Sequence, residues 1–211
     1  MVNEIENDPF IVKTYNKIEK IQKTRDYADH GWRHINKVVE NIKQILKVYD
    51  SSLIETGMIA ALLHDIGVVD GKSNHAEESC LMATKYLQDK ELVNKEMILD
   101  AIRYHGNGKD DFHLVGLALV LADKIDFDKN RILPLGMEDP FFLEILNIDD
   151  VIIVAKKETL IIKFLVNQNF DRKKMESYYF VDKIFKAVQS FAAYAKIGYQ
   201  IQINDQEWKK G

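Results

Sequence analysis

Six histidines in this chain of 211 residues offer the side chains best suited to chemistry, and their placement is more informative than their number. Four of them, together with two aspartates, fall close to the ends of expected helices. These residues are His34, His64, Asp65, His75, His105 and Asp123. Helical bundles build metal and cofactor sites where side chains from facing helices converge. Imidazole nitrogens combined with carboxylate oxygens suit iron, manganese, zinc, cobalt or nickel, so the placement predicts a metal centre.

Each of these residues taken alone has a simpler explanation. A histidine at a helix C-terminus is favoured by the helix dipole, and a His-Asp pair arises by chance in a chain of this composition. The joint pattern argues for a metal, because Asp65 and Asp123 each follow a strongly apolar run, at residues 60–63 and 117–122. Burying a carboxylate without compensation is costly, and coordination to a metal removes that cost.

The first two-thirds of the chain predict the helices that would carry these ligands. Apolar residues recur there in steps of three and four, which is the spacing of a helix face. The expected helices cover residues 11–21, 35–49, 51–67, 76–87, 97–105 and 112–125. The third opens at a capping signal, Asp50-Ser51-Ser52. The last is apolar nearly all round, so we expect it at the centre of the bundle.

The pattern changes after about residue 130. Two β-branched runs, at residues 150–155 and 159–166, flank Lys156-Lys157-Glu158 and predict a hairpin with a solvated tip. A hairpin alone is marginally stable, so the apolar stripe over residues 181–195 predicts a long helix that packs on it. Residues 199–203 alternate as a candidate third strand, and the last seven residues are expected to fray. The predicted fold is therefore mostly α, with a helical bundle at 1–131 and a small C-terminal α+β appendage at 132–211.

Composition narrows the class of protein. Hydrophobic residues make up 46% and charged residues 29% of the chain, which is ordinary globular usage and excludes disorder. The single cysteine, Cys80, cannot form an intramolecular disulfide, which fits a reducing cytosol. A net charge of −4 does not predict binding to nucleic acid. The N-terminus lacks the features of a signal peptide, and the longest apolar stretch, near residues 115–122, is too short to span a bilayer. We therefore expect a soluble, cytoplasmic protein without a membrane partner.

The ordered ligand set lies in segments that resemble the HD-domain superfamily of metal-dependent phosphohydrolases. The segments are HGWRHINKVV, AALLHDIG, NHAEESCLMA, AIRYHGNG and LALVLADKID. They agree with the family in order and spacing over residues 25–131, and the C-terminal third lies outside the resemblance. The resemblance implies an HD-type helical bundle with a metal site at its centre.

The resemblance also implies how the ligands divide. His34, His64, Asp65 and Asp123 would hold one ion. His75 and His105 are present as in the binuclear six-ligand subset, where Asp65 would bridge two ions. The two ions are expected to be iron or manganese, with Mg, Zn, Co or Ni as alternatives. The chain departs from related members at Gly31, where they often carry an acidic residue.

The implied activity is hydrolysis of a phosphate ester or anhydride, with a nucleotide or a related small metabolite as the expected substrate. Two dications close together acidify a water, and the resulting hydroxide attacks phosphorus. Besides Asp65, the candidate catalytic residues are Lys124, which would offset phosphoryl charge, and His30, which would protonate the leaving oxygen or orient a ligand. Lys124 and Arg131 are the candidate substrate-binding residues. Solvent exposure at a helix end is the plainer alternative for Lys124, and a surface position is the plainer alternative for Arg131.

Two other functions fit the same residues. Di-iron oxygenases of the HD type use the same six-ligand arrangement, and fold alone does not separate them from hydrolases. A non-catalytic metal-containing regulatory or binding module is the second alternative, with residues 132–211 as its partner surface. Under any of these functions, the hairpin would either form a wall of the pocket or pair across a homodimer.

Overall fold

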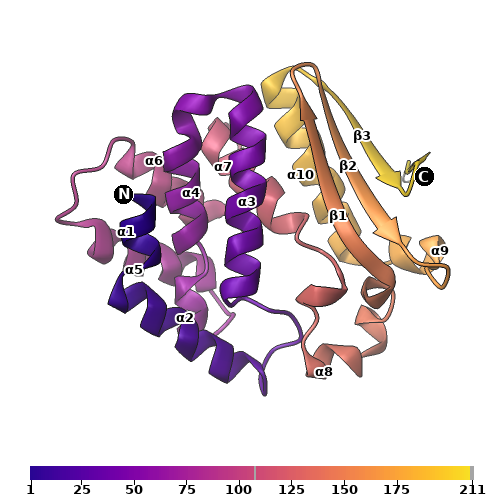
Figure 1. The fold of residues 1–211 in the computed structure, drawn as a ribbon, viewed down its shortest axis with the longest axis horizontal. Helices are drawn as coiled ribbons and strands as arrows, with labels where there is room; N and C mark the ends of the chain where they lie inside the picture. The colour runs from indigo at the N-terminus through magenta and orange to yellow at the C-terminus, as the bar shows by residue number, and fades with distance from the viewer. Residues whose placement is uncertain (107, 210–211) are drawn as a thin grey trace.

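A bundle of helices and a C-terminal sheet lie side by side in the computed structural model, which describes residues 1–106 and 108–209 (Figure 1). The α-helices of these residues are α1 (Val2–Glu6), α2 (Pro9–Gln22), α3 (Trp32–Tyr49), α4 (Ile54–Leu63), α5 (His75–Leu87), α6 (Lys95–Tyr104), α7 (Leu114–Lys124), α8 (Pro134–Met137), α9 (Arg172–Glu176) and α10 (Tyr179–Ala195). The 3₁₀ turns are η1 (Ser51–Leu53), η2 (Ile66–Asp70), η3 (Lys129–Arg131), η4 (Pro140–Phe142) and η5 (Ile145–Asn147). The strands are β1 (Ile148–Lys156), β2 (Thr159–Val166), β3 (Gly198–Ile203) and β4 (Gln206–Glu207). The predicted mostly α fold with a small C-terminal α+β appendage is confirmed.

The centre of the bundle is built from α3, α4 and α7. Seven of the ten residues of α4 and eight of the eleven residues of α7 are buried, as expected for helices that are apolar nearly all round. α3 approaches α4 closely at Gly57, where an added Cβ would lie 2.4 Å from Leu46 Cδ1. A larger residue at this position would push the two helices apart, and with them the ligands at their ends.

Helix boundaries differ slightly from the sequence prediction for local reasons. The Asp50 carboxylate accepts a hydrogen bond from the Ser52 amide, as the capping signal predicts, but the turn that it caps is η1, and α4 begins only at Ile54. α7 begins at Leu114 because the His113 side chain accepts a hydrogen bond from the Gly116 amide and caps the helix.

The stretch Ser51–Asp70, with 20 residues, is long and apolar enough on average to cross a membrane. It is interrupted by Glu55, His64 and Asp65, so residues 115–122 remain the longer uninterrupted apolar run. Within the most apolar window of Ser51–Asp70, 72% of the residues are buried inside the structure. That burial is typical of the core helix of a soluble protein, and the stretch carries His64 and Asp65 into the interior.

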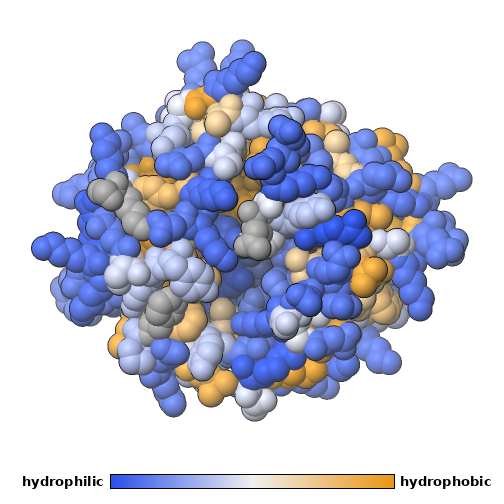
Figure 2. All heavy atoms as spheres, turned by 180° about the vertical axis from the view of Figure 1, so that it is seen from behind, coloured by the Kyte–Doolittle hydropathy of each residue, from blue (hydrophilic) through white to orange (hydrophobic). Residues whose placement is uncertain are grey.

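The C-terminal sheet has the strand order β1-β2-β3-β4. β1 and β2 form the predicted antiparallel hairpin, and the candidate third strand is confirmed as β3, which runs parallel to β2. The helix α10 makes the crossover between them and lies between the sheet and the bundle (Figure 1). The face of the molecule turned away in Figure 1 is mainly hydrophilic and is hollowed near its middle (Figure 2).

The expectation of a frayed C-terminus is wrong for the residues that are described. Trp208 is 2% exposed, and its ring contacts Phe164 of β2 and Phe185 of α10. Its indole N–H donates a hydrogen bond to Glu176 Oε1 at 2.8 Å. Burial of a tryptophan with a satisfied N–H is a strong anchor, so the short strand β4 that precedes it is held in place.

Residues 132–209 pack directly on the bundle. α10 lies against α7, and the Tyr49 hydroxyl at the end of α3 donates hydrogen bonds to the Lys156 and Thr159 carbonyls of the hairpin. The Leu133 amide donates a hydrogen bond to the Tyr27 carbonyl at 2.9 Å. The division into domains at residue 131 stays a prediction, whereas the packing across it brings C-terminal side chains next to the expected metal ligands.

Candidate metal centre

The ends of five helices bring all six expected ligands together. His34 lies in the first turn of α3, and Asp123 lies in the last turn of α7. His64 follows α4 directly, and Asp65 is the next residue. His75 begins α5 and His105 follows α6. Every ligand is therefore fixed by a helix end that packs in the core, which gives the site the rigidity that metal coordination requires.

One group of ligand atoms surrounds His34. Its Nε2 lies 3.3 Å from His64 Nε2 and 3.5 Å from Asp65 Oδ2. The same nitrogen lies 3.4 Å from Asp123 Oδ1, and the four side chains are nearly or fully buried. His34, His64 and Asp65 form a group that could hold a metal ion.

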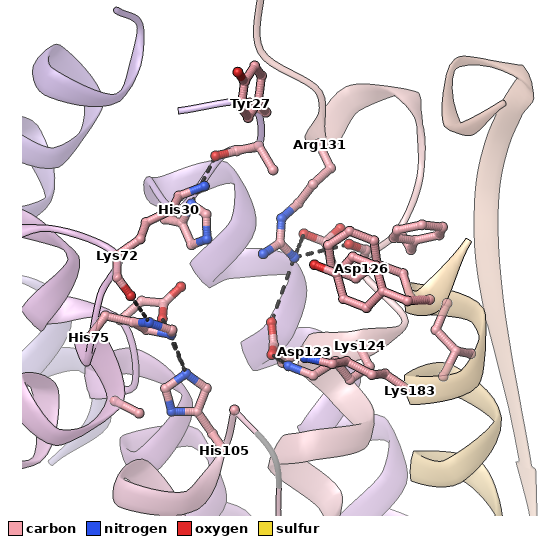
Figure 3. Close-up of a pocket in the computed structure, with 18 of the residues that line it drawn as sticks. Tyr27, His30, Lys72, His75, His105, Asp123, Lys124, Asp126, Arg131 and Lys183 are labelled. Carbon is pink, nitrogen blue, oxygen red and sulfur yellow. Dashed lines mark hydrogen bonds and ion pairs between the residues drawn. The ribbon is translucent and has the colours of Figure 1, made fainter. Parts of the chain in front are cut away.

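A second group lies on the other side of Asp65. His75 Nε2 and His105 Nε2 are 3.1 Å apart and lie 3.6 and 3.4 Å from Asp65 Oδ1. Figure 3 shows the two imidazoles pointing toward each other at the floor of the pocket. Asp65, His75 and His105 form a second group that could hold an ion. The two oxygens of one carboxylate thus face two different groups.

The tautomers show that these nitrogens present lone pairs to one another. His64, His75 and His105 each place Nδ1 2.7–2.9 Å from a backbone carbonyl. A carbonyl only accepts, so each Nδ1 carries the hydrogen and each neutral ring leaves its Nε2 lone pair facing the site. Lone pairs about 3 Å apart repel, and a cation between them removes the repulsion. Ligands bound at about 2.1 Å are about 3.0 to 3.4 Å apart around a metal, which matches both groups.

Asp65 supplies the second sign that a cation fits. Its Oδ1 is buried and has no hydrogen-bond partner among the described residues. An orphaned carboxylate oxygen in a protein core is costly. The donor set of imidazoles and carboxylates, without a thiolate, suits borderline dications of the first transition row. The residues present therefore fit the ions that the sequence predicts.

The electrostatics of the site are consistent with this fit. Burial lowers the pKa of His64 to about 4, so the ring is neutral and can act as a ligand. Burial also opposes a charge on His34, but hydrogen bonds to Asp123, Asp126 and Asp65 outweigh it and raise the His34 pKa to about 10. Burial would raise the pKa of Asp65, yet the surrounding histidines hold it well below its usual range. In the ion-free protein, a proton on His34 thus offsets part of the buried negative charge.

Asp126 is a functional residue that the sequence reasoning missed. It is 1% exposed, and its Oδ2 accepts hydrogen bonds from His34 Nδ1 at 2.6 Å and Arg33 Nη1 at 2.8 Å. It therefore orients His34, as second-layer carboxylates commonly do for metal-bound histidines. The signal was present in the segment LADKID, where an acidic residue follows Asp123 by three positions.

We expect Asp126→Asn to weaken metal binding by about 10- to 100-fold, the usual effect of losing such a carboxylate. The amide keeps the shape of the side chain but no longer supports the His34 N–H with a full negative charge. Titration of the metal-free protein with Mn²⁺ or Fe²⁺ measures the change. Asp149→Asn is the control, because Asp149 is an exposed aspartate whose Oδ1 pairs with Lys129 at 2.6 Å. Equal affinities in the two variants would contradict the orienting role.

A substitution of His75 tests whether the two ligand groups bind separate ions. Its side chain is 27% exposed, and its loss leaves His34, His64 and Asp123 untouched. We expect His75→Ala to lower the bound metal from two ions per chain to about one and to remove most of the turnover. Metal analysis after reconstitution tests this, with His113→Ala as the control because His113 belongs to neither group. Unchanged stoichiometry and rate would mean that His75 is not a ligand.

The two groups open into a cavity of about 690 Å³. Its lining includes five cations, Lys72, Arg103, Lys124, Arg131 and Lys183, and Arg103 is paired with Glu77 at 3.1 Å. Figure 3 shows Arg131, Asp123 and Lys124 on the side of the pocket opposite His75. This volume lies within the range of small-molecule sites, about 300–1,000 Å³.

Two of these cations were expected from the sequence, and both lie in the site rather than at the surface. Lys124 Nζ lies 2.5 Å from Asp123 Oδ2, and its side chain is 18% exposed. Arg131 Nη1 lies 3.3 Å from Asp126 Oδ2 and 3.7 Å from Asp123 Oδ1. Arg131 Nε is buried without a hydrogen-bond partner among the described residues. The surface alternatives for both side chains are therefore wrong.

The sequence reasoning missed the other three cations, Lys72, Arg103 and Lys183. Neither Lys72 nor Lys183 has an ion-pair partner in the described part of the chain. Burial lowers the pKa of both ammonium groups. Nothing in the local sequence marks Lys183, because it reaches the cavity through the long-range packing of α10 on α7.

His30 also lines the cavity. Its Nδ1 lies 2.9 Å from the Ala28 carbonyl, and its ring lies edge-on to His34 and His75. Burial lowers its pKa well below the usual value, so the ring is neutral and Nε2 is an acceptor. The next residue, Gly31, fits a close approach, since a Cβ there would lie 2.6 Å from Glu19 Cγ. A larger residue at this position would have to displace the Glu19 side chain.

Comparisons with known proteins were made on this chain. A family model described as HD domain matches residues 31–128. Among solved structures, 9 chains match. One of them is described as a predicted HD superfamily hydrolase from an uncultured Thermotogales bacterium. It is 21% identical, with a TM-score of 0.43, and the match covers 90% of this chain and 95% of that one. No curated protein matches the chain.

Proposed function

Because residues 31–128 belong to the HD-domain family, we propose that this protein is a phosphohydrolase that uses two metal ions to cleave a phosphate ester or anhydride. The family and the His/Asp groups indicate a metal-dependent hydrolase. The finer proposal adds two bound ions and a phosphorylated substrate, with a nucleotide or a related small metabolite as the expected compound.

One observation supports the proposal above all others. Four imidazoles present Nε2 to a shared carboxylate, with Nε2 pairs 3.3 and 3.1 Å apart, while every Nδ1 is held by a carbonyl or a carboxylate. A metal ion in each group would replace the contact between facing nitrogens with coordination bonds. The side chain of His75 is 27% exposed, so the site is open to a substrate on the cavity side.

The cations of the cavity support phosphate chemistry. Lys72 and Lys183 have no acidic partner in the described residues, and Arg131 has a free buried Nε. Such donors, held in a partly buried pocket, suit the oxygens of a phosphoryl group. An apolar substrate would leave Lys72 and Lys183 without an ion-pair partner among the described residues. A phosphate ester or anhydride therefore fits the pocket better than a neutral compound.

Each of the cavity residues would have a distinct role in the reaction. Ions bound by the six ligands would supply an acidified water and neutralise phosphoryl oxygens. Arg131 and Lys124 lie beside Asp123 and would orient the phosphoryl group toward the ligands. His30 holds its Nδ1 hydrogen on the Ala28 carbonyl and would accept a proton at Nε2. The acceptor role fits this geometry better than protonation of the leaving oxygen.

The proposal is tested by metal analysis of protein purified without oxygen, followed by a phosphate-release screen with phosphate esters and anhydrides. We expect two transition-metal ions per chain and release of inorganic phosphate from at least one class. Absence of metal after reconstitution would overturn the proposal. Oxygen uptake coupled to substrate cleavage, without phosphate release by hydrolysis, would support an HD-type oxygenase instead.

A further inference from the structure

The wall of the cavity away from the metal ligands is built from aromatic rings. Tyr27, Phe127, Phe142, Tyr179 and Phe180 all line it. The rings are contiguous: Tyr27 stacks on Phe142 with centroids 5.5 Å apart, and Phe180 lies 6.5 Å from Phe142 and 5.9 Å from Phe127. Tyr179 stacks on Phe180 at 4.1 Å. We call these five rings the aromatic wall.

The aromatic wall is not simply part of the hydrophobic core. Tyr27 is 45% exposed and Tyr179 is 53% exposed, so the wall reaches the mouth of the cavity. Figure 3 shows Tyr27 at the end of the pocket away from His105. Exposed aromatic rings that line a concave site are typical of ligand recognition.

Most of the aromatic wall lies outside the family-matched residues. Tyr27 precedes residue 31, Phe142 ends η4, and Tyr179 and Phe180 begin α10. The family-matched part supplies the metal ligands, whereas the chain's own flanking segments supply the rings. This division is typical of a common catalytic centre with a specificity surface added to it.

The aromatic wall and the cations of the cavity adjoin each other on α10. Lys183 lies one helical turn after Tyr179, and its Nζ lies 5.4 Å from the centroid of that ring. The cavity therefore changes from charged to aromatic within a few ångströms. A substrate that fills it would join an anionic group to a flat apolar group.

We infer that the aromatic wall binds a planar ring in the organic half of the substrate, so that the enzyme prefers phosphate compounds carrying such a ring. Rings gain from offset stacking and edge-to-face contacts in a way that aliphatic chains do not. This inference rests on the proposed function, and it names the feature of the substrate that the chain's own flanking segments recognise.

The test compares two kinds of substrate that contain the same phosphate ester bond, one with a planar ring and one without. Nucleoside 5′-monophosphates with adenine, guanine, cytosine or uracil share the ribose 5-phosphate ester, whereas ribose 5-phosphate lacks the ring. We expect kcat/KM of the metal-loaded protein to be at least about tenfold higher for one or more of the four nucleotides, since stacking of a base on one aromatic side chain is worth about 5- to 150-fold.

Phe142→Leu and Phe180→Leu keep apolar volume in the wall but remove a ring face. We expect each variant to lower the ratio of kcat/KM between the preferred nucleotide and ribose 5-phosphate by about 5-fold or more. Tyr194→Leu is the control, because Tyr194 is a 52% exposed aromatic residue on the same helix that does not line the cavity. Its ratio is expected to equal that of the unmodified protein.

A second measurement does not depend on turnover. Calorimetric titration of the metal-loaded protein with the four free nucleosides is expected to show binding that Phe180→Leu weakens and Tyr194→Leu does not. Equal use of nucleotides and ribose 5-phosphate, or a preference for octyl phosphate, would overturn the inference while the hydrolase proposal stands. Nucleoside binding that depends on Phe180, without phosphate release from any compound, would support the wall and overturn the proposed function.

Discussion

Replacing Asp65 with alanine is expected to abolish turnover and to remove most of the bound metal. Its Oδ2 lies 3.4 Å from His64 Nε2, and its Oδ1 lies 3.4 Å from His105 Nε2. No other side chain faces both groups, within the described residues, in the two clusters that could hold an ion. The change removes a ligand from each ion together with a full negative charge. Activity on the substrate found by phosphate release, together with metal content per chain, measures the effect.

The matched controls separate loss of the ligand from loss of the fold. Asp65→Asn keeps the volume of the side chain and is expected to lose activity to a similar extent, because the charge has gone. Cys80→Ala also alters a buried residue, 1% exposed, but Cys80 lies outside both ligand groups, with Sγ 3.4 Å from the Leu99 carbonyl. It is expected to retain both metal and turnover. Comparable activity in the Asp65→Ala and Cys80→Ala variants would exclude a bridging role for Asp65.

The helical part of the fold could be predicted because its information is local. Helix faces, caps and apolar runs all act over a few residues, so the elements near His34, His75 and Asp123 were expected within a few positions of where they lie. The same reasoning explains why the ligands could be expected to meet. Each follows or begins a buried helix, and helices of one bundle have few ways to pack.

The C-terminal part was predicted less well because it depends on contacts distant in sequence. Nothing in β3 alone indicates that it pairs with β2 in parallel through α10. Trp208 was expected to fray, since the residues around it are polar, yet its ring is held by Phe164 and Phe185. Turn and strand patterns do not reveal such anchoring partners, which lie 44 and 23 residues away in the chain.

The same limit applies to the site. The metal ligands could be found from residue type and helix position, but Lys183 and Phe180 become part of the cavity only when α10 packs on α7. Asp126 was within reach of sequence reasoning, because it lies on the ligand segment itself. Side chains that act through a local motif are therefore easier to predict than those that a distant element delivers to the site.

Lys124→Ala is expected to lower turnover by about 10²- to 10³-fold, the range seen when a donor to a developing oxyanion is removed. Lys124 Nζ lies 2.5 Å from Asp123 Oδ2 and lines the cavity beside the ligands. An ammonium at this position can follow charge that develops on phosphoryl oxygens during cleavage. Both metal ions are expected to stay bound, because an ammonium is not a ligand and because Asp123 loses a competitor for its oxygen. Steady-state kinetics with metal analysis on the same preparation measure both quantities.

Two further variants show whether the charge acts on the substrate or only on Asp123. Lys124→Arg is expected to restore turnover in part, since a planar guanidinium does not replace a compact ammonium. Lys157→Ala removes an exposed lysine at the tip of the β1–β2 hairpin and is expected to leave turnover and metal content unchanged. Near-native turnover in Lys124→Ala, with both ions bound, would mean that the ammonium merely balances the Asp123 carboxylate. Arg131, Lys72 and Lys183, which line the same cavity, would then be the residues that bind the phosphoryl group.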